Sequence, residues 1–160
     1  MLYPIGIQSF EKIRTGGFVY VDKTALIYRL AASGQYYFLS RPRRFGKSLL
    51  VSTMEAYFSG RKELFEGLAM ESLEKGWTEY PVLHLDLTGS SYTDISQLKI
   101  SLEQHLRKWE SLYDVTPVSE DLSSRFKDVI DAAYRKTGQK VVILIDEYEK
   151  PIIDNIDNPE

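Results

Sequence analysis

Apolar and polar positions along the chain predict short strands that alternate with amphipathic helices. Three short apolar runs, each bounded by turn residues, predict strands at 36–39, 82–87 and 141–145. The run at 141–145 is apolar at every position, as is typical of a parallel strand covered by helices on both faces. Residues 18–21 are a weaker candidate for a further short strand.

Between these runs, apolar residues recur at helical spacing. Four segments have this period: 24–32, 47–58, 95–113 and 122–133. Gly60 and Gly138 follow two of them and can end those helices, and Ser119 is the predicted N-cap of the last one. Strands that alternate with helices indicate an α/β protein with a parallel sheet wrapped on both faces.

Composition narrows the class of protein. The 160 residues predict one domain, and 43% of them are apolar, which is typical of a globular chain. The net charge of −3 argues against a protein whose main task is to grip a nucleic-acid backbone, although it leaves room for a local basic patch. There is no cysteine, no apolar run long enough for a membrane span and no secretory signal, so we expect a cytoplasmic protein.

The segment 36–50, YYFLSRPRRFGKSLL, carries the most informative motif. A predicted strand leads into a loop, then into Gly46–Lys47–Ser48 and an apolar helix, which is the layout of a nucleotide phosphate loop. The usual pattern is G-x-x-x-x-G-K-[ST], and Arg41 stands here in place of its first glycine. The amides that wrap a phosphate come from the second half of such a loop, so we expect the loop to bind phosphate still.

This motif assigns candidate roles to particular residues. Lys47 is expected to reach the outer phosphates and to stabilise their charge during catalysis, and the hydroxyl of Ser48 is expected to bind Mg²⁺. Gly46 allows a close approach of the backbone. The predicted ATP-binding residues are Arg43, Arg44, Phe45, Gly46, Lys47, Ser48 and Leu49. A Gly-Lys-Ser tripeptide also arises by chance, so the flanking strand and helix carry much of the argument.

A second acidic motif strengthens this interpretation. The apolar run at 141–145 leads directly into Asp146 and Glu147. Asp146 is expected to hold Mg²⁺, and Glu147 to act as the general base that orients the attacking water. An aspartate that caps the turn after a buried strand is the ordinary alternative, but it does not account for the phosphate-loop motif upstream.

Three stretches together resemble the bacterial AAA-ATPase-like family: PIGIQSFEKIRTGGFVYVDKT (4–24), YYFLSRPRRFGKSLL (36–50) and VVILIDEYEKPI (141–152). In that family the arginine-containing loop is the usual form. The resemblance runs over the whole chain and implies a P-loop NTPase of the additional-strand, catalytic-glutamate class. Its fold is a three-layer α/β/α arrangement around a mostly parallel sheet, and its cofactors are ATP and Mg²⁺.

Compared with that family, the sequence looks like the N-terminal portion of a longer protein. Residues 1–33 are expected to form an N-terminal strand and helix segment, and 34–160 the core from the phosphate loop to the Asp-Glu motif. The later core strands and a C-terminal nuclease-like domain, which implies a nucleic-acid partner, are expected beyond residue 160. An incomplete sheet leaves an open edge, which predicts self-association.

Three functions follow from these motifs. The first is Mg²⁺-ATP binding, with ATP hydrolysis in the complete protein. The second is a nucleotide-dependent interaction switch with negligible turnover. The third is a structural or DNA-associated module whose loop does not hold nucleotide.

Other polar residues leave two interpretations open. Asp86 lies near the end of the run at 82–87 and is a candidate to line the same cleft as Asp146, since ligands gather at the carboxyl ends of strands, or else it has no role in the site. Asp22–Lys23–Thr24 either forms a turn or lies near the nucleotide base. His84 and His105 have no second histidine at ligand spacing and are interpreted as structural.

Overall fold

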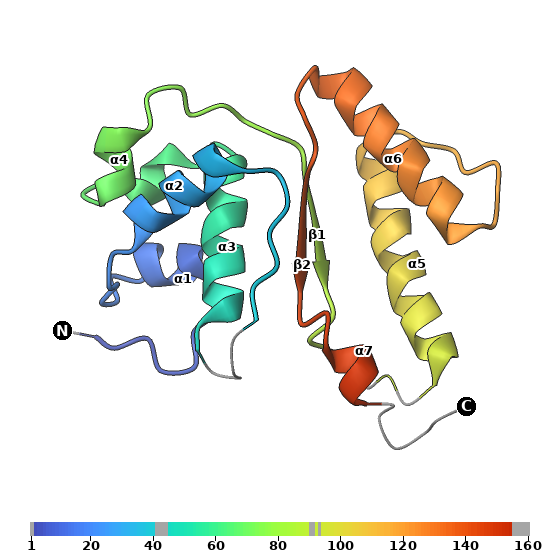
Figure 1. Cartoon of the computed structure of the whole chain (residues 1–160), viewed down its shortest axis with the longest axis horizontal. Coiled ribbons are helices and arrows are strands. Elements are labelled where there is room, and N and C mark those ends of the chain that lie inside the picture. The colour runs from blue at the N-terminus through green and yellow to red at the C-terminus, as the bar shows by residue number, and fades with distance from the viewer. Residues whose placement is uncertain (1, 41–44, 90–91, 93, 155–160) are drawn as a thin grey trace. The chain divides into compact units, whose positions relative to one another are not determined.

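The chain forms two compact units, Met1–Glu79 (unit 1) and Tyr80–Glu160 (unit 2). The computed structural model describes residues 2–40, 45–89, 92 and 94–154 (Figure 1). Each unit has its own hydrophobic core. Both named strands lie in unit 2, so the protein is a mixed α/β structure with a small parallel sheet. None of the helices in these ranges is both long and apolar enough to cross a membrane.

Unit 1 is built from short helices. In chain order they are α1 (Phe10–Thr15), α2 (Thr24–Ser33), α3 (Lys47–Phe58), the 3-10 helix η1 (Lys62–Phe65) and α4 (Ala69–Leu73). The predicted helices at 24–32 and 47–58 are confirmed. Gly60 follows α3 with a φ of 69°, and its amide donates to the carbonyl of Tyr57, as expected of a helix terminator.

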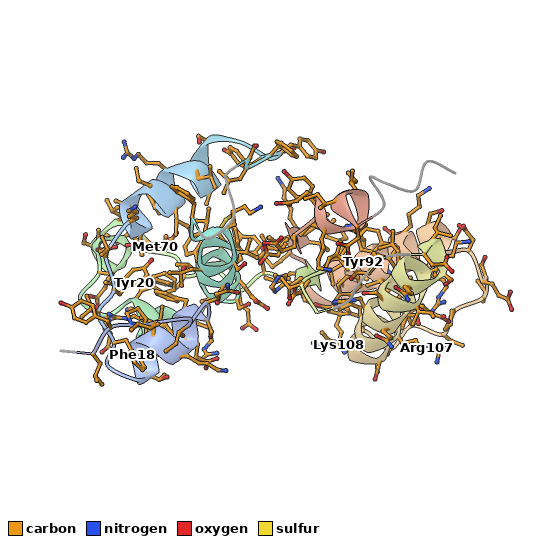
Figure 2. All side chains as sticks on the ribbon, turned by 90° about the horizontal axis from the view of Figure 1, so that it is seen from below. Phe18, Tyr20, Met70, Tyr92, Arg107 and Lys108 are labelled. Atoms are coloured by element: carbon orange, nitrogen blue, oxygen red, sulfur yellow. The ribbon has the colours of Figure 1, made fainter. Side chains whose placement is uncertain are left out.

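Aromatic rings fill the core of unit 1. Phe10 and Phe65 are fully buried with ring centroids 4.9 Å apart, and the ring of Trp77 lies 5.2 Å from that of Phe65. Met70 of α4 is fully buried in the same cluster, and Figure 2 shows it on the same side of unit 1 as Tyr20. α1 and α3 are in contact, and Leu49 and Leu50 in the first turn of α3 pack against this cluster.

The prediction of a strand at 36–39 is wrong, because the structure has no strand there. The segment is exposed, with Tyr36 at 92% and Phe38 at 75% of their full accessible surface. A strand needs a neighbour to pair its N–H and C=O groups. In the described part of unit 1, strand pairing is limited to an isolated bridge between Leu2 and Phe18. The weaker strand candidate at 18–21 is also not found as a strand, and only Phe18 takes part in that bridge.

Unit 2 alternates strands and helices in the predicted order. Its elements are β1 (Val82–Asp86), α5 (Ile95–Leu112), α6 (Leu122–Thr137), β2 (Val142–Asp146) and α7 (Lys150–Ile153). Gly138 ends α6 in the left-handed conformation, as predicted. The N-cap of α6 is Asp121 rather than Ser119, because the Asp121 carboxylate accepts from the amide of Ser124 while the Ser119 hydroxyl accepts from the amide of Asp121.

The two strands form a parallel pair in a fixed register. Val82 lies opposite Val142 and Asp86 opposite Asp146. Both strands point toward α7 in Figure 1, so their carboxyl ends meet at one edge of the sheet. The helices α5 and α6 pack together over β1 through a core that includes Leu83, Trp109 and Val129.

β2 is less covered than its apolar sequence predicts. Ile143 and Ile145 keep 43% and 47% of their accessible surface, whereas Leu144 is buried. The expected strand with both faces covered is therefore not found, because α5 and α6 pack mainly over β1. An uninterrupted apolar run indicates that both faces of a strand favour burial, but it does not predict which elements cover each face.

Candidate functional site

The first candidate group lies at the beginning of α3. Gly46 is the N-cap and has a φ of 77°, in the left-handed region that favours glycine. A Cβ added there would meet nothing within 4 Å, so the backbone angle is what requires glycine. Lys47 and Ser48 are the first two residues of the helix; Lys47 is buried and Ser48 is half-buried.

This helix end has the features of an anion site. No side chain caps α3, and the carbonyl of Gly46 accepts the first helical hydrogen bond from the amide of Leu50. The first amides of a helix point outward along its axis and carry partial positive charge, which favours phosphate. Phe45, just before the glycine, is 64% exposed. The candidates Arg43 and Arg44, and also Arg41, lie outside the described residues.

The second candidate group lies at the end of β2, in unit 2. Asp146 is the last residue of the strand and is buried, and one of its carboxylate oxygens accepts from the amide of Glu147 at 3.0 Å. Glu147 is half-buried and has a φ of 55°, an unusual angle for a residue with a side chain. Its backbone turns the chain sharply at the sheet edge where α/β proteins bind ligands.

The structure brings Asp86 beside Asp146. The two residues are register partners at the carboxyl ends of neighbouring parallel strands, so their side chains leave the same face of the sheet. Asp86 is exposed, and its carboxylate accepts from the amide of Thr88 at 2.8 Å, which fixes its orientation. Asp86 is therefore both beside Asp146 in the register and exposed to solvent, and its role in a site stays a prediction.

Asp22 and Thr24 form a turn that joins two helices. The Asp22 carboxylate accepts from the amides of Thr24 and Ala69, and the Thr24 hydroxyl accepts from the amide of Met70. Burial raises the pKa of Asp22, but the hydrogen bonds from Ala69 and Thr24 outweigh it and hold the pKa below its ordinary value. The Asp22 carboxylate thus accepts hydrogen bonds from the first residues of both α2 and α4. These contacts give the Asp22–Lys23–Thr24 motif a structural role.

Sequence reasoning missed the contacts that support the end of β2. Tyr92 and Asp154 come from separate segments, and the amide of Tyr92 donates to the Asp154 carboxylate at 2.9 Å. The sequence does contain one signal for this contact, because Lys150 precedes Asp154 by four residues and the two form an ion pair. An aromatic residue alone in a polar loop gives no comparable sign of its partner.

The described residues contain no group of three or more His, Asp or Glu side chains placed to hold a metal ion. A Mg²⁺ site with fewer carboxylates is still compatible with these residues. Mg²⁺ commonly takes one or two carboxylates and completes its shell with water and the phosphates of a nucleotide. Asp146, with Asp86 beside it, offers that number of carboxylates.

Unit 2 thus has a small parallel sheet with acidic residues at its carboxyl edge, and unit 1 has a glycine-led helix that begins with lysine and serine. Both features occur in α/β proteins that bind ligands. The chain belongs to the AAA-ATPase-like family, described as "Predicted AAA-ATPase", which it matches over residues 4–160. Membership in this family suggests nucleotide binding.

One relative comes from Azotobacter chroococcum mcd 1 and is named "Uncharacterized protein in vnfD 5'region". It is 40% identical over 158 residues, which cover 98% of this chain and 31% of the relative. The chain therefore spans about a third of the length of the protein it matches. No solved structure matches the chain.

Proposed function

We propose that this chain is the nucleotide-binding part of a P-loop ATPase and binds Mg²⁺-ATP. The observation that carries the proposal is the beginning of α3, where a left-handed glycine leads directly into Lys47 and Ser48 in a member of a predicted AAA-ATPase family. The missing first glycine of the loop does not count against it, since Gly46 provides the backbone angle required next to the helix. We propose a cytoplasmic location, where ATP is supplied.

Each candidate residue has a role in this proposal. The α3 amides and Lys47 hold the phosphates, with Arg43, Arg44, Phe45 and Leu49 completing the loop. Ser48 and Asp146 hold Mg²⁺, which neutralises phosphate charge when bound. Glu147 orients the water that attacks the terminal phosphate and accepts its proton.

The finer architecture belongs to the same proposal. We propose that residues 1–160 are the N-terminal portion of a three-layer α/β/α P-loop domain with a mostly parallel sheet. The parallel register of β1 and β2, with α5 and α6 in the connection, supports it. We propose that further strands complete the domain in a longer protein, since this chain covers 31% of the relative from Azotobacter chroococcum mcd 1.

The test is a Mg²⁺-ATP titration by calorimetry. We expect saturable binding by the wild-type protein and its loss in Lys47→Ala, because that variant removes the cation that faces the phosphates. Lys12→Ala is the matched control, since it removes an exposed lysine from another helix of the same unit. Equal binding by the wild type and by folded Lys47→Ala would contradict the proposal.

Hydrolysis is tested separately in the longest available form of the protein. Glu147→Gln should lower turnover by a factor on the order of 10² to 10⁴ while ATP binding survives, since the amide cannot accept the proton of water. Unchanged turnover in this variant would remove Glu147 from the mechanism.

A nucleotide-dependent interaction switch is the second candidate function. It is favoured by the open edges of the β1–β2 pair within the described residues and by the exposed segment 36–39, because unpaired strand edges recruit other chains. Its signature is self-association that depends on ATP without release of phosphate. Light scattering with and without Mg²⁺-ATP, together with a phosphate assay, distinguishes it from the ATPase.

A further inference from the structure

The segment that follows Glu147 is too short to hold its shape alone. α7 has four residues, and an isolated helix of this length is not stable in water. The carbonyl of Glu147 accepts from the amide of Lys150 at 2.9 Å, so the first turn of α7 is bonded directly to the residue proposed as general base. Whatever fixes α7 in place therefore also fixes the backbone of Glu147.

Asp154, at the end of α7, makes the contacts that fix it. One oxygen of its carboxylate accepts from the amide of Tyr92 and from the ammonium group of Lys150, both at 2.9 Å. The side chains of Lys150 and Asp154 are 22% and 20% exposed, so this pair is partly shielded from water. Charge-assisted hydrogen bonds of this kind are about twice as strong as neutral ones.

Tyr92 provides a firm anchor for these contacts. It lies in the connection from β1 to α5, is 1% exposed, and its hydroxyl lies 3.2 Å from that of Ser101 on α5. The ammonium group of Lys150 also lies 5.2 Å from the centre of its ring, within the range of a cation–π contact. In Figure 2, Tyr92 is in the interior of unit 2, whereas Arg107 and Lys108 are at its surface.

We propose that Asp154 is a positioning residue that holds Glu147 in place for hydrolysis by tying α7 to the connection between β1 and α5. The inference rests on the proposed ATPase function, and it adds a residue to which neither the motifs nor the family assigns a role. Asp154 acts through the backbone of Glu147 and touches no nucleotide in this scheme. Its loss should therefore affect turnover far more than ATP binding.

The first test measures how firmly Asp154 holds α7 in place, and it does not depend on enzymatic activity. Hydrogen–deuterium exchange of the ligand-free protein should show amides at 147–150 exchanging about tenfold faster in Asp154→Ala than in the wild type, because α7 opens more often. Asp131→Ala, an exposed aspartate on α6, is the matched control and should exchange as the wild type does. Unchanged exchange at 147–150 in Asp154→Ala would overturn the proposal.

The second test measures turnover and ATP affinity in the longest available form of the protein. Asp154→Ala should lower kcat on the order of 10 to 100-fold, with KM for ATP changed less than about threefold, since a small displacement of a catalytic group costs this much. Asp154→Asn keeps an acceptor for the Tyr92 amide and should recover part of the loss. It also replaces Asp154→Ala if the alanine variant does not fold.

A double variant separates positioning from general stability. In a Glu147→Gln background, Asp154→Ala should cause little further loss of turnover, because the group that it positions is already absent. An equal loss in both backgrounds would overturn the proposal. A wild-type protein without turnover would instead overturn the proposed function, and this inference with it, whereas normal wild-type turnover that Asp154→Ala leaves unchanged would overturn the inference alone.

Discussion

Glu147 occupies a backbone conformation that most side chains avoid. Its φ of 55° brings Cβ close to the following carbonyl oxygen, which costs on the order of 1–2 kcal/mol for an ordinary residue. A glutamate side chain gains nothing from this angle, yet Glu147 follows the buried carboxylate at the end of β2. Strain of this kind persists where a site requires a particular side chain in a particular place.

Replacing Glu147 should therefore separate stability from function. We expect Glu147→Gly and Glu147→Asn to raise the free energy of unfolding by about 0.5–1 kcal/mol, since both residues tolerate the left-handed region. Glu147→Gln should leave it unchanged, because its Cβ is the same. Urea unfolding followed by circular dichroism measures these differences, and stabilisation by glutamine equal to that by glycine would contradict the explanation.

Asp121 predicts how stability depends on pH. Its carboxylate accepts from the Ser123 hydroxyl and the Ser124 amide, and these hydrogen bonds lower its pKa to about 2 from 3.8. Because the folded pKa is depressed, the stabilisation is fully present above the unfolded pKa and is lost as the pH falls toward 2.

Asp121→Asn tests this dependence, because asparagine keeps the cap but does not titrate. The difference in melting temperature between the wild type and this variant should shrink as the pH falls from about 5 to 2. Asp131→Asn, on the exposed side of the same helix, is the control. A difference that stays constant over this range would show that the charge of Asp121 does not contribute.

At the scale of elements, α5 and α6 are joined by a buried ion pair. The Arg125 guanidinium donates to both oxygens of the Glu110 carboxylate, at 2.7 and 2.8 Å, and both side chains are less than 8% exposed. Glu103 lies 3.6 Å from the same guanidinium. These groups line an open cavity of about 420 Å³ with Val118 and Glu120, so the pair lies just beneath the surface.

Breaking this pair should be costly. Arg125→Ala leaves the Glu110 charge buried without its partner and should lower the free energy of unfolding by about 3–5 kcal/mol, whereas Arg125→Met with Glu110→Leu should come close to the wild type. Arg107→Ala is the matched control, since that side chain is 72% exposed and its ion pair is worth less than about 1 kcal/mol. Chemical unfolding of the four proteins tests this, and a double variant as unstable as Arg125→Ala would contradict it.

The elements differ in how well the sequence predicts them. Apolar periodicity predicts α2, α3, α5, β1 and β2 within one residue at each end, because this signal is local, whereas the periodic run at 122–133 stops four residues before the end of α6 at Thr137. The segment 36–39 has the same apolar character but forms no strand, since pairing depends on a distant partner. The ion pair of Arg125 and the contact of Asp154 with Tyr92 are equally non-local, and periodicity does not reveal them.

The candidate site is predictable to a similar extent. The motifs locate Gly46, Lys47 and Asp146 at the ends of elements where the structure also has them. The register that sets Asp86 opposite Asp146 could not be predicted, because a strand pattern does not fix which strand is its neighbour. The left-handed turn at Glu147 has no sequence signal, since glutamate is not a residue that favours it.

At the scale of the whole molecule, ligand binding and the stability of the folded protein are linked. Any ligand that binds only the folded protein stabilises it by mass action. Mg²⁺-ATP at about 100 times its Kd should therefore raise the unfolding free energy by about 2.7 kcal/mol. A thermal shift assay should detect this in the wild type but not in Lys47→Ala, and equal shifts in the two proteins would place the ligand elsewhere.

The exposed run at 36–39 has a practical consequence for anyone who prepares this protein. Tyr36, Tyr37, Phe38 and Leu39 are consecutive, uncharged and β-prone, and each keeps at least 37% of its surface in contact with solvent. Such segments nucleate aggregation when no strand covers them. Tyr36 is the most exposed of the four, and Tyr36→Lys should improve solubility at high concentration because it places a charge in the segment. The wild-type protein is best kept dilute.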